Sequence, residues 1–173
     1  MRRLSPGDVV EPMQLESLSH GPVAIPSSKL VHLQFRRFAG CPICNLHLRD
    51  YSKGLEQLKA AGVESVAFFH STVEEMLPYQ GSLPFPIVAD PQKTHYRRFG
   101  VEASFVGMLH PRVTLKFLQG VFTTKSSMMD GSGGHLGLPA DFLIAPDGTV
   151  RAAHYGAHAD DHWSVADVLA LAR

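Results

Sequence analysis

Two cysteines three positions apart, set between a strand-like and a helix-like segment, constrain the fold of this chain more than any other feature. The motif is C-P-I-C at residues 41–44, and the 173 residues contain only these two cysteines. The segment before it, Leu30–Phe35, is mostly apolar, which is typical of a buried strand. After it, apolar residues recur at helical spacing over residues 43–58, and Gly62 follows them. The sequence therefore predicts a buried strand followed by one helix that carries both cysteines at its start.

Strand-like and helix-like segments alternate along most of the chain. Early strand–helix–strand units imply right-handed crossovers and a parallel core. The P-D-G sequence at residues 146–148 predicts a tight turn that joins the last two strands into an antiparallel hairpin. The predicted fold class is therefore α/β, a mixed central sheet with helices on both faces. We expect further strands at residues 63–69, 84–90, 140–145 and 149–155, and further helices at residues 71–79, 92–99, 113–122 and 163–171.

The chain is expected to form a single domain over residues 1–173, because no repeat and no linker divides it. Residues 1–29 are polar and punctuated by proline, so we expect a loop-rich N-terminal extension with a short hairpin. Residues 102–137 are expected to form an irregular insertion apart from the helix at 113–122.

Balanced charge and the lack of a long apolar run argue against two classes of partner, nucleic acids and membranes. Lys and Arg together number 16, as do Asp and Glu, so the formal net charge is zero. A general nucleic-acid binder needs a basic surplus to contact phosphates, so we expect no nucleic-acid partner. No apolar run approaches the roughly 20 residues that span a bilayer, and no signal peptide is visible. We therefore expect a cytoplasmic protein without a membrane partner.

The C-P-I-C motif favours redox chemistry. A helix N-terminus carries partial positive charge and free N–H groups, which favour a thiolate over a thiol. Pro42 suits the first helical turn and limits how the loop between the cysteines flexes. We expect Cys41 and Cys44 to alternate between a dithiol and a disulfide, with no bound cofactor.

Two other interpretations of the cysteines remain open at this point. In the first, the chain is a non-catalytic binding module and its buried cysteines are structural. In the second, Cys41, Cys44 and His47 hold a metal, although a structural zinc site needs four ligands and no other cysteine exists. The binding module predicts ordinary thiol pKa values, and the metal site predicts stoichiometric zinc.

Four passages of the sequence resemble the peroxiredoxin-like (AhpC/TSA) branch of the thioredoxin-like superfamily. They are S-P-G-D-V-V-E-P at residues 5–12, L-Q-F-R-R-F-A-G-C-P-I-C at 33–44, Y-R-R-F-G-V at 96–101 and L-P-A-D-F-L-I-A-P-D-G at 138–148. The resemblance implies a thioredoxin-like fold and a thiol-dependent antioxidant oxidoreductase. It also implies a peroxide or disulfide substrate, a thioredoxin- or glutathione-type reductant, and a homodimer.

The resemblance further implies a cis proline at Pro139, lying across from the cysteines. It leaves open which thiol attacks. Thioredoxins place the attacking thiol first, at Cys41, whereas alignment on the peroxiredoxin motif selects Cys44. That alignment puts Cys41 where peroxiredoxins have threonine and Arg37 where they have proline, and their later arginine is absent near Pro139.

Four further residues are candidates for supporting roles. Arg36 or Arg37, just before the cysteines, could stabilise a thiolate or a peroxide oxygen. His70 follows the second predicted strand, near the carboxyl ends of the strands where open α/β sheets place their sites, and could transfer protons. His135, in a glycine-rich segment, is expected to approach Pro139.

Overall fold

A five-stranded mixed sheet forms the centre of the molecule. The computed structural model describes residues 2–101, 111–127, 134 and 137–173. The strand order is β5-β4-β3-β6-β7, in which β3, β4 and β5 are parallel and β6 and β7 are antiparallel to their neighbours. The predicted mixed α/β sheet is thereby confirmed. The strands are β3 (Leu30–Phe35), β4 (Val63–Phe69), β5 (Ile87–Ala89), β6 (Ala140–Ile144) and β7 (Val150–Tyr155).

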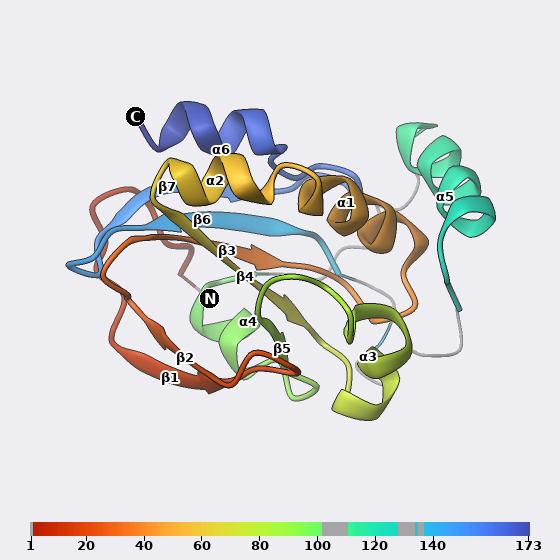
Figure 1. Ribbon diagram of the computed structural model, residues 1–173, viewed down its shortest axis with the longest axis horizontal. Coiled ribbons are helices and arrows are strands. Elements are labelled where there is room, and N and C mark those ends of the chain that lie inside the picture. Colours follow the sequence, from red (N-terminus) through yellow and green to blue (C-terminus); the bar gives the residue numbers. More distant parts are fainter. Residues whose placement is uncertain (1, 102–110, 128–133, 135–136) are drawn as a thin grey trace.

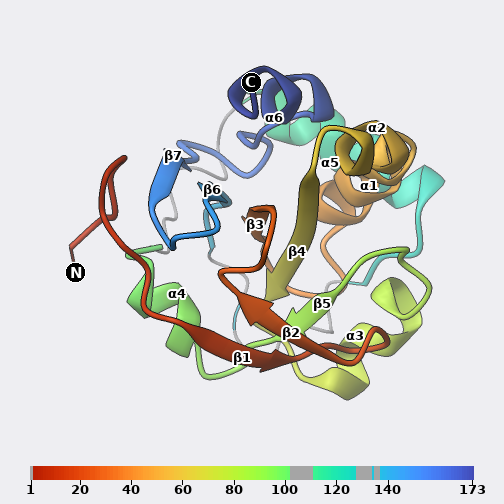
Figure 2. The same ribbon diagram turned by 60° about the vertical axis from the view of Figure 1, so that its left-hand side comes forward.

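Helices cover one face of this sheet, and a hairpin with a short helix covers the other (Figure 1). The first layer contains α1 (Pro42–Ser52), α2 (Leu55–Ala60) and α6 (Val165–Leu171). The second contains α4 (Thr94–Arg98) and the antiparallel hairpin of β1 (Met13–Glu16) and β2 (Pro22–Ile25). Helix α3 (Val73–Gln80) follows β4, and α5 (Pro111–Thr123) lies beside α1, as the turned view in Figure 2 also shows. The hairpin expected within residues 1–29 and the helix expected at 113–122 are both present.

Each face of the sheet buries its own hydrophobic core, which follows from the two-residue periodicity of a strand. In β3, Val31, Leu33 and Phe35 point toward the hairpin and α4, where they join the core that includes Phe68 and Phe142. The opposite core lies under α1, α2 and α6. Its members include Leu48, Tyr51, Leu58, Ala67, Phe69, Leu143 and Val168.

The helix expected over residues 43–58 is broken into α1 and α2. The backbone N–H of Gly54 bonds the carbonyl of Tyr51, one residue closer than in an α-helix, and a new helix begins at Leu55. A Cβ atom at Gly54 would lie 2.7 Å from Val165 Cγ1. The break therefore occurs where Val165 of α6 packs against the chain, a contact that periodicity in the local sequence does not encode.

Candidate active site at the start of α1

Cys41 and Cys44 lie at the N-terminus of α1 as free thiols. Cys41 is the N-cap residue, and its sulfur accepts the backbone N–H of Cys44 at 3.4 Å. The thiol of Cys44 also donates to Cys41 Sγ, with the two sulfurs 2.8 Å apart. Pro42 occupies the first helical position, where the lack of an N–H costs nothing. The sulfurs are thus held close enough to form a disulfide with a small movement.

The two thiols differ in acidity. Burial opposes ionisation of Cys41, but the hydrogen bond from Cys44, the charge of Arg37 and nearby backbone N–H groups outweigh it and lower its pKa to about 7. Burial, the donated hydrogen bond and the adjacent sulfur together raise the pKa of Cys44 well above its ordinary value. Near neutral pH the negative charge therefore resides on Cys41, and Cys44 keeps its proton.

Arg37 lies directly beside this thiolate. Its Nη1 is 3.7 Å from Cys41 Sγ, and only 2% of the residue is exposed. A buried guanidinium next to a sulfur stabilises negative charge there more than a solvated one would, because water screens it less. Of the two arginines considered from the sequence, Arg37 is the one that contacts the cysteine.

His70 lies next to Arg37 at the end of β4. The backbone N–H of His70 donates to the carbonyl oxygen of Arg37 at 3.3 Å, and the histidine is 1% exposed. A Cβ atom at Gly137 would lie 2.9 Å from His70 Nε2 and 3.6 Å from Arg37 Cγ. The segment before β6 therefore packs directly on these two side chains. His135 is outside the described residues.

Pro139 directly precedes β6, but its peptide bond is not the expected cis bond. Among the described residues the cis peptide bond is Ile25–Pro26, and Leu138–Pro139 is trans, the isomer that an X–Pro bond favours by default. The carbonyl of Pro139 accepts the N–H of Gly156 at 2.9 Å, and its ring packs against Gly156. The expectation of a cis proline here was therefore wrong.

Arg36 points away from the cysteines into a buried ion pair. Its guanidinium donates to both carboxylate oxygens of Asp141, at 2.8 Å and 3.3 Å, and to Gln34 Oε1 at 2.8 Å. His32 Nε2 lies 2.9 Å from the same carboxylate. Although burial opposes ionisation of Asp141, the charge of Arg36 and the bond from His32 hold its pKa far below the usual range.

The imidazole of His32 is neutral, because burial lowers its pKa more than Asp141 raises it. Its Nε2–H donates to Asp141, so its Nδ1 accepts the hydroxyl of Tyr51 at 2.7 Å. Tyr51 belongs to α1, and Asp141 also accepts the backbone N–H of Trp163. The network thus connects the centre of the sheet to α1 and to the segment before α6, and it fixes the chain that leads into the cysteine motif.

Of these network residues, the sequence pointed only to Arg36, and for a different role beside the cysteines. The available signal was the alternation in and after β3, where His32, Gln34 and Arg36 each follow an apolar residue. That pattern puts the three side chains on one face. Their partner Asp141 is far away in sequence and lies opposite Gln34 only through the antiparallel pairing of β3 with β6.

His47 does not join the cysteines in a metal cluster. Its Nε2 accepts a hydrogen bond from Arg36 Nη2 at 3.2 Å, and its ring contacts that of His162, with centroids 3.7 Å apart. Within the part of the chain that the structure describes, no three His, Cys, Asp or Glu side chains are grouped to hold a metal ion. No helix among those residues is long and apolar enough to cross a bilayer.

Solved structures with the same fold include redox proteins. Peroxidoxin BcpB from Mycobacterium tuberculosis superposes with a TM-score of 0.69 at 17% identity, covering 99% of this chain and 97% of that chain. A putative thiol:disulfide interchange protein DsbE from Chlorobium tepidum gives 0.64 at 19% identity, with 98% and 99% coverage. AhpC from Mycobacterium tuberculosis gives 0.69 at 13% identity, with 99% and 92% coverage. A comparison with curated protein sequences gives no match.

The sheet order and the dithiol at the start of α1 define the class as a thioredoxin-fold protein of the peroxiredoxin-like type. The model of the AhpC/TSA antioxidant enzyme family matches residues 47–158, which is more than half of the chain. The chain therefore belongs to the AhpC/TSA family. The matched region begins after Cys44, so the cysteine motif itself lies just outside it.

Proposed function

We propose that this chain is a thiol oxidoreductase that reduces a peroxide or a disulfide through Cys41 and Cys44. Cys41 is the attacking thiol and Cys44 is the resolving thiol. The observation that carries this assignment is the asymmetry of the pair, since Cys41 receives hydrogen bonds and lies beside Arg37 while Cys44 donates. The thiolate is the nucleophile in such reactions, so the sulfur with the lowered pKa attacks first.

With a peroxide, the Cys41 thiolate attacks one peroxide oxygen and the O–O bond breaks. Cys41 becomes a sulfenic acid, and the leaving alkoxide or hydroxide takes a proton to give an alcohol or water. The sulfur of Cys44 then attacks the sulfenic sulfur, which forms the Cys41–Cys44 disulfide and releases water. Two electrons have passed from the dithiol to the peroxide.

With a disulfide, the Cys41 thiolate attacks one sulfur and expels the other as a thiolate, which leaves a mixed disulfide on Cys41. Cys44 displaces the remaining thiol and closes the same Cys41–Cys44 bond. In both cases a thioredoxin- or glutathione-type dithiol or thiol must return two electrons. The names of the neighbouring folds, a peroxidoxin and a thiol:disulfide interchange protein, support these two substrate classes equally.

Four other residues complete the proposed site. Arg37 stabilises the Cys41 thiolate and can contact a peroxide oxygen, and His70, which lies next to Arg37, transfers protons. Pro42 fixes the geometry of the loop between the cysteines. Pro139 packs against Gly156 and shapes the segment that leads into β6.

Stopped-flow oxidation of the reduced protein tests the proposal. Hydrogen peroxide and a small aromatic disulfide are each mixed with the protein, and free thiols are counted before and after. Loss of two thiols with either oxidant is the expected result. Retention of both thiols with both oxidants would instead favour a non-catalytic binding module, and tightly bound zinc in the purified protein would favour a metal site.

A further inference from the structure

The end of α5 and the residues after it lie directly on the cysteine motif. A Cβ atom at Gly120 would lie 2.5 Å from the carbonyl oxygen of Pro42, and one at Gly40 would overlap the backbone of Ser127. The N–H of Ser127 also donates to the carbonyl of Gly40 at 3.1 Å. Residues 120–127, called the cover below, therefore pack against Gly40 and Pro42, the residues on both sides of Cys41.

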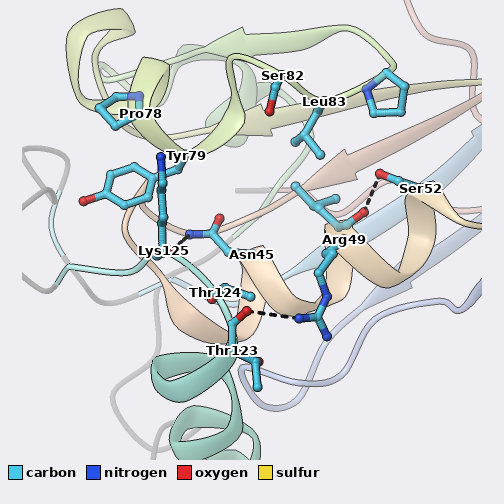
Figure 3. A pocket seen from close by; sticks show the side chains of 12 residues that line it. Asn45, Arg49, Ser52, Pro78, Tyr79, Ser82, Leu83, Thr123, Thr124 and Lys125 are labelled. Atoms are coloured by element: carbon cyan, nitrogen blue, oxygen red, sulfur yellow. Dashed lines mark hydrogen bonds between the residues drawn. The ribbon is translucent and has the colours of Figure 1, made fainter.

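Side chains of α1 hold the cover in place. Asn45 Nδ2 donates to the carbonyl of Lys125 at 3.1 Å, and Arg49 Nη1 donates to the carbonyl of Thr123 at 3.1 Å, as the dashed lines in Figure 3 show. Asn45 is itself fixed, because Gln80 Nε2 donates to its Oδ1 at 2.7 Å. The cover is thus attached at several points along the helix that carries the cysteines.

The side of the cover that faces α3 is open. A groove of about 400 Å³ separates the two, with Tyr79 and Leu83 on one wall and Thr124 and Lys125 on the other. The groove leaves room for the cover to move toward α3. The fold therefore provides a direction in which the cover can be displaced.

The sulfurs are buried in the arrangement in which the cover packs on Gly40 and Pro42. Cys41 is 0% exposed and Cys44 is 2% exposed. A small molecule needs a narrower opening than a folded protein does, so a smaller movement of the packing is enough to admit it. A disulfide on the surface of a folded protein cannot reach Cys41 Sγ unless the contacts of Gly40 and Pro42 with the cover separate.

We propose that the cover determines the size of the oxidant, so that Cys41 reacts with small molecules and excludes protein disulfides while the cover is closed. Gly120 is the specificity-determining residue, because only a residue without a side chain lets α5 approach Pro42 this closely. The inference rests on the proposed function, in which Cys41 attacks the oxidant. Among the peroxides and disulfides that this function allows, it selects the small molecules.

Alkylation of the reduced protein by probes of different size tests the cover without requiring turnover. Iodoacetamide is compared with a maleimide that carries a long polyethylene glycol chain. Each alkylation rate is divided by the rate of the same probe with a free cysteine peptide, which gives its relative rate. The probe ratio is the relative rate of the large probe divided by that of the small probe. The unaltered protein should strongly favour the small probe. Gly120→Val, which wedges the cover away from Pro42, should raise the relative rate of the large probe by about tenfold, equivalent to ~1.4 kcal/mol in the free energy of opening.

Two further variants serve as a control for general destabilisation and as a replacement if Gly120→Val does not fold. Gly54→Val introduces a similar clash against Val165 on the far part of the helix layer, so it should destabilise the fold but leave the probe ratio unchanged. Arg49→Ala removes one attachment and no packed atom of the cover, so it should raise the ratio even if Gly120→Val fails to fold. Equal relative rates in the unaltered protein, or an equal effect of Gly54→Val, would overturn the proposal.

The two proposals can fail separately. If the probe ratio behaves as expected but peroxide and disulfide leave both thiols intact, the cover exists and the proposed function is wrong. If both thiols are oxidised rapidly by a folded protein disulfide in the unaltered protein, the proposed function stands and the cover proposal is wrong.

Discussion

The guanidinium of Arg37 lies 3.7 Å from the sulfur of Cys41, inside the protein and beyond the screening of bulk water. Since this positive charge favours the thiolate, the reaction rate with a small oxidant should rise with pH through about 7 and reach a plateau above it. Arg37→Met should move this midpoint upward by about one pH unit, because loss of an adjacent opposite charge disfavours the ionised form. Stopped-flow rates across the pH range measure the shift.

The matched control for this prediction is Lys53→Met, which removes a cation from an exposed ion pair with Asp50 at the far end of α1. Its pH profile should coincide with that of the unaltered protein. An unchanged midpoint in Arg37→Met would contradict the role given to this arginine.

Single cysteine variants should trap different species. Cys44→Ser keeps the proposed attacking thiol, so it should accumulate a sulfenic acid with peroxide or a mixed disulfide with a disulfide, at Cys41. Cys41→Ser leaves only Cys44, whose pKa burial still raises, so it should react slowly and trap little. Intact-protein mass spectrometry distinguishes the adducts. Faster trapping by Cys41→Ser would reverse the order of the two thiols.

Asp141 should be essential to stability, because it neutralises Arg36 and binds His32 in a fully buried place. Asp141→Asn leaves the arginine charge without its counter-charge, which costs about 3–5 kcal/mol in the free energy of unfolding. Urea denaturation measures this loss. Asp50→Asn, in an exposed pair, should cost less than about 1 kcal/mol, and a similar loss in both variants would refute the importance of the buried network.

The same network should make the protein sensitive to acid. The pKa of Asp141 is depressed in the folded state, so the stability it contributes is present above its unfolded pKa of about 4 and decreases as the pH falls further. The pKa of His32 is lowered by burial, so below about pH 6.5 the unfolded state takes up a proton that the folded state does not.

The effects of Asp141 and of His32 both lower the free energy of unfolding as the pH falls. Burial also lowers the pKa values of His47 and His162, which adds to this decrease. The free energy of unfolding should therefore fall continuously from about pH 7 to about pH 4. Urea titrations at a series of pH values measure this slope. A stability that is constant or rises over that range would contradict the protonation states described for the network.

The sheet and the cysteine motif were predictable because their signals are local. The apolar segments Leu30–Phe35 and Val63–Phe69 have the pattern of buried strands, and the structure has strands with these bounds. The P-D-G turn likewise predicted the hairpin of β6 and β7, with Gly148 at a φ of 86°. Each of these features depends on neighbouring residues alone.

The features that were missed depend on contacts between distant segments. Asp141 meets Arg36 only because β6 pairs with β3, and the break at Gly54 reflects the packing of α6. The contact of Gly120 with Pro42 depends on where α5 lies, which the pattern of α5 does not specify. Spacing also could not rank the two cysteines, whereas hydrogen-bond direction and the position of Arg37 distinguish them.

The most direct test of the central claim identifies which sulfur is the nucleophile in the unaltered protein. The fully reduced protein is treated at neutral pH with less than one equivalent of iodoacetamide, digested, and mapped by peptide mass spectrometry. Because the thiolate resides on Cys41, the label should be found on Cys41, with Cys44 almost unmodified. Preferential labelling of Cys44 would contradict the account, because the resolving thiol would then be the more reactive one.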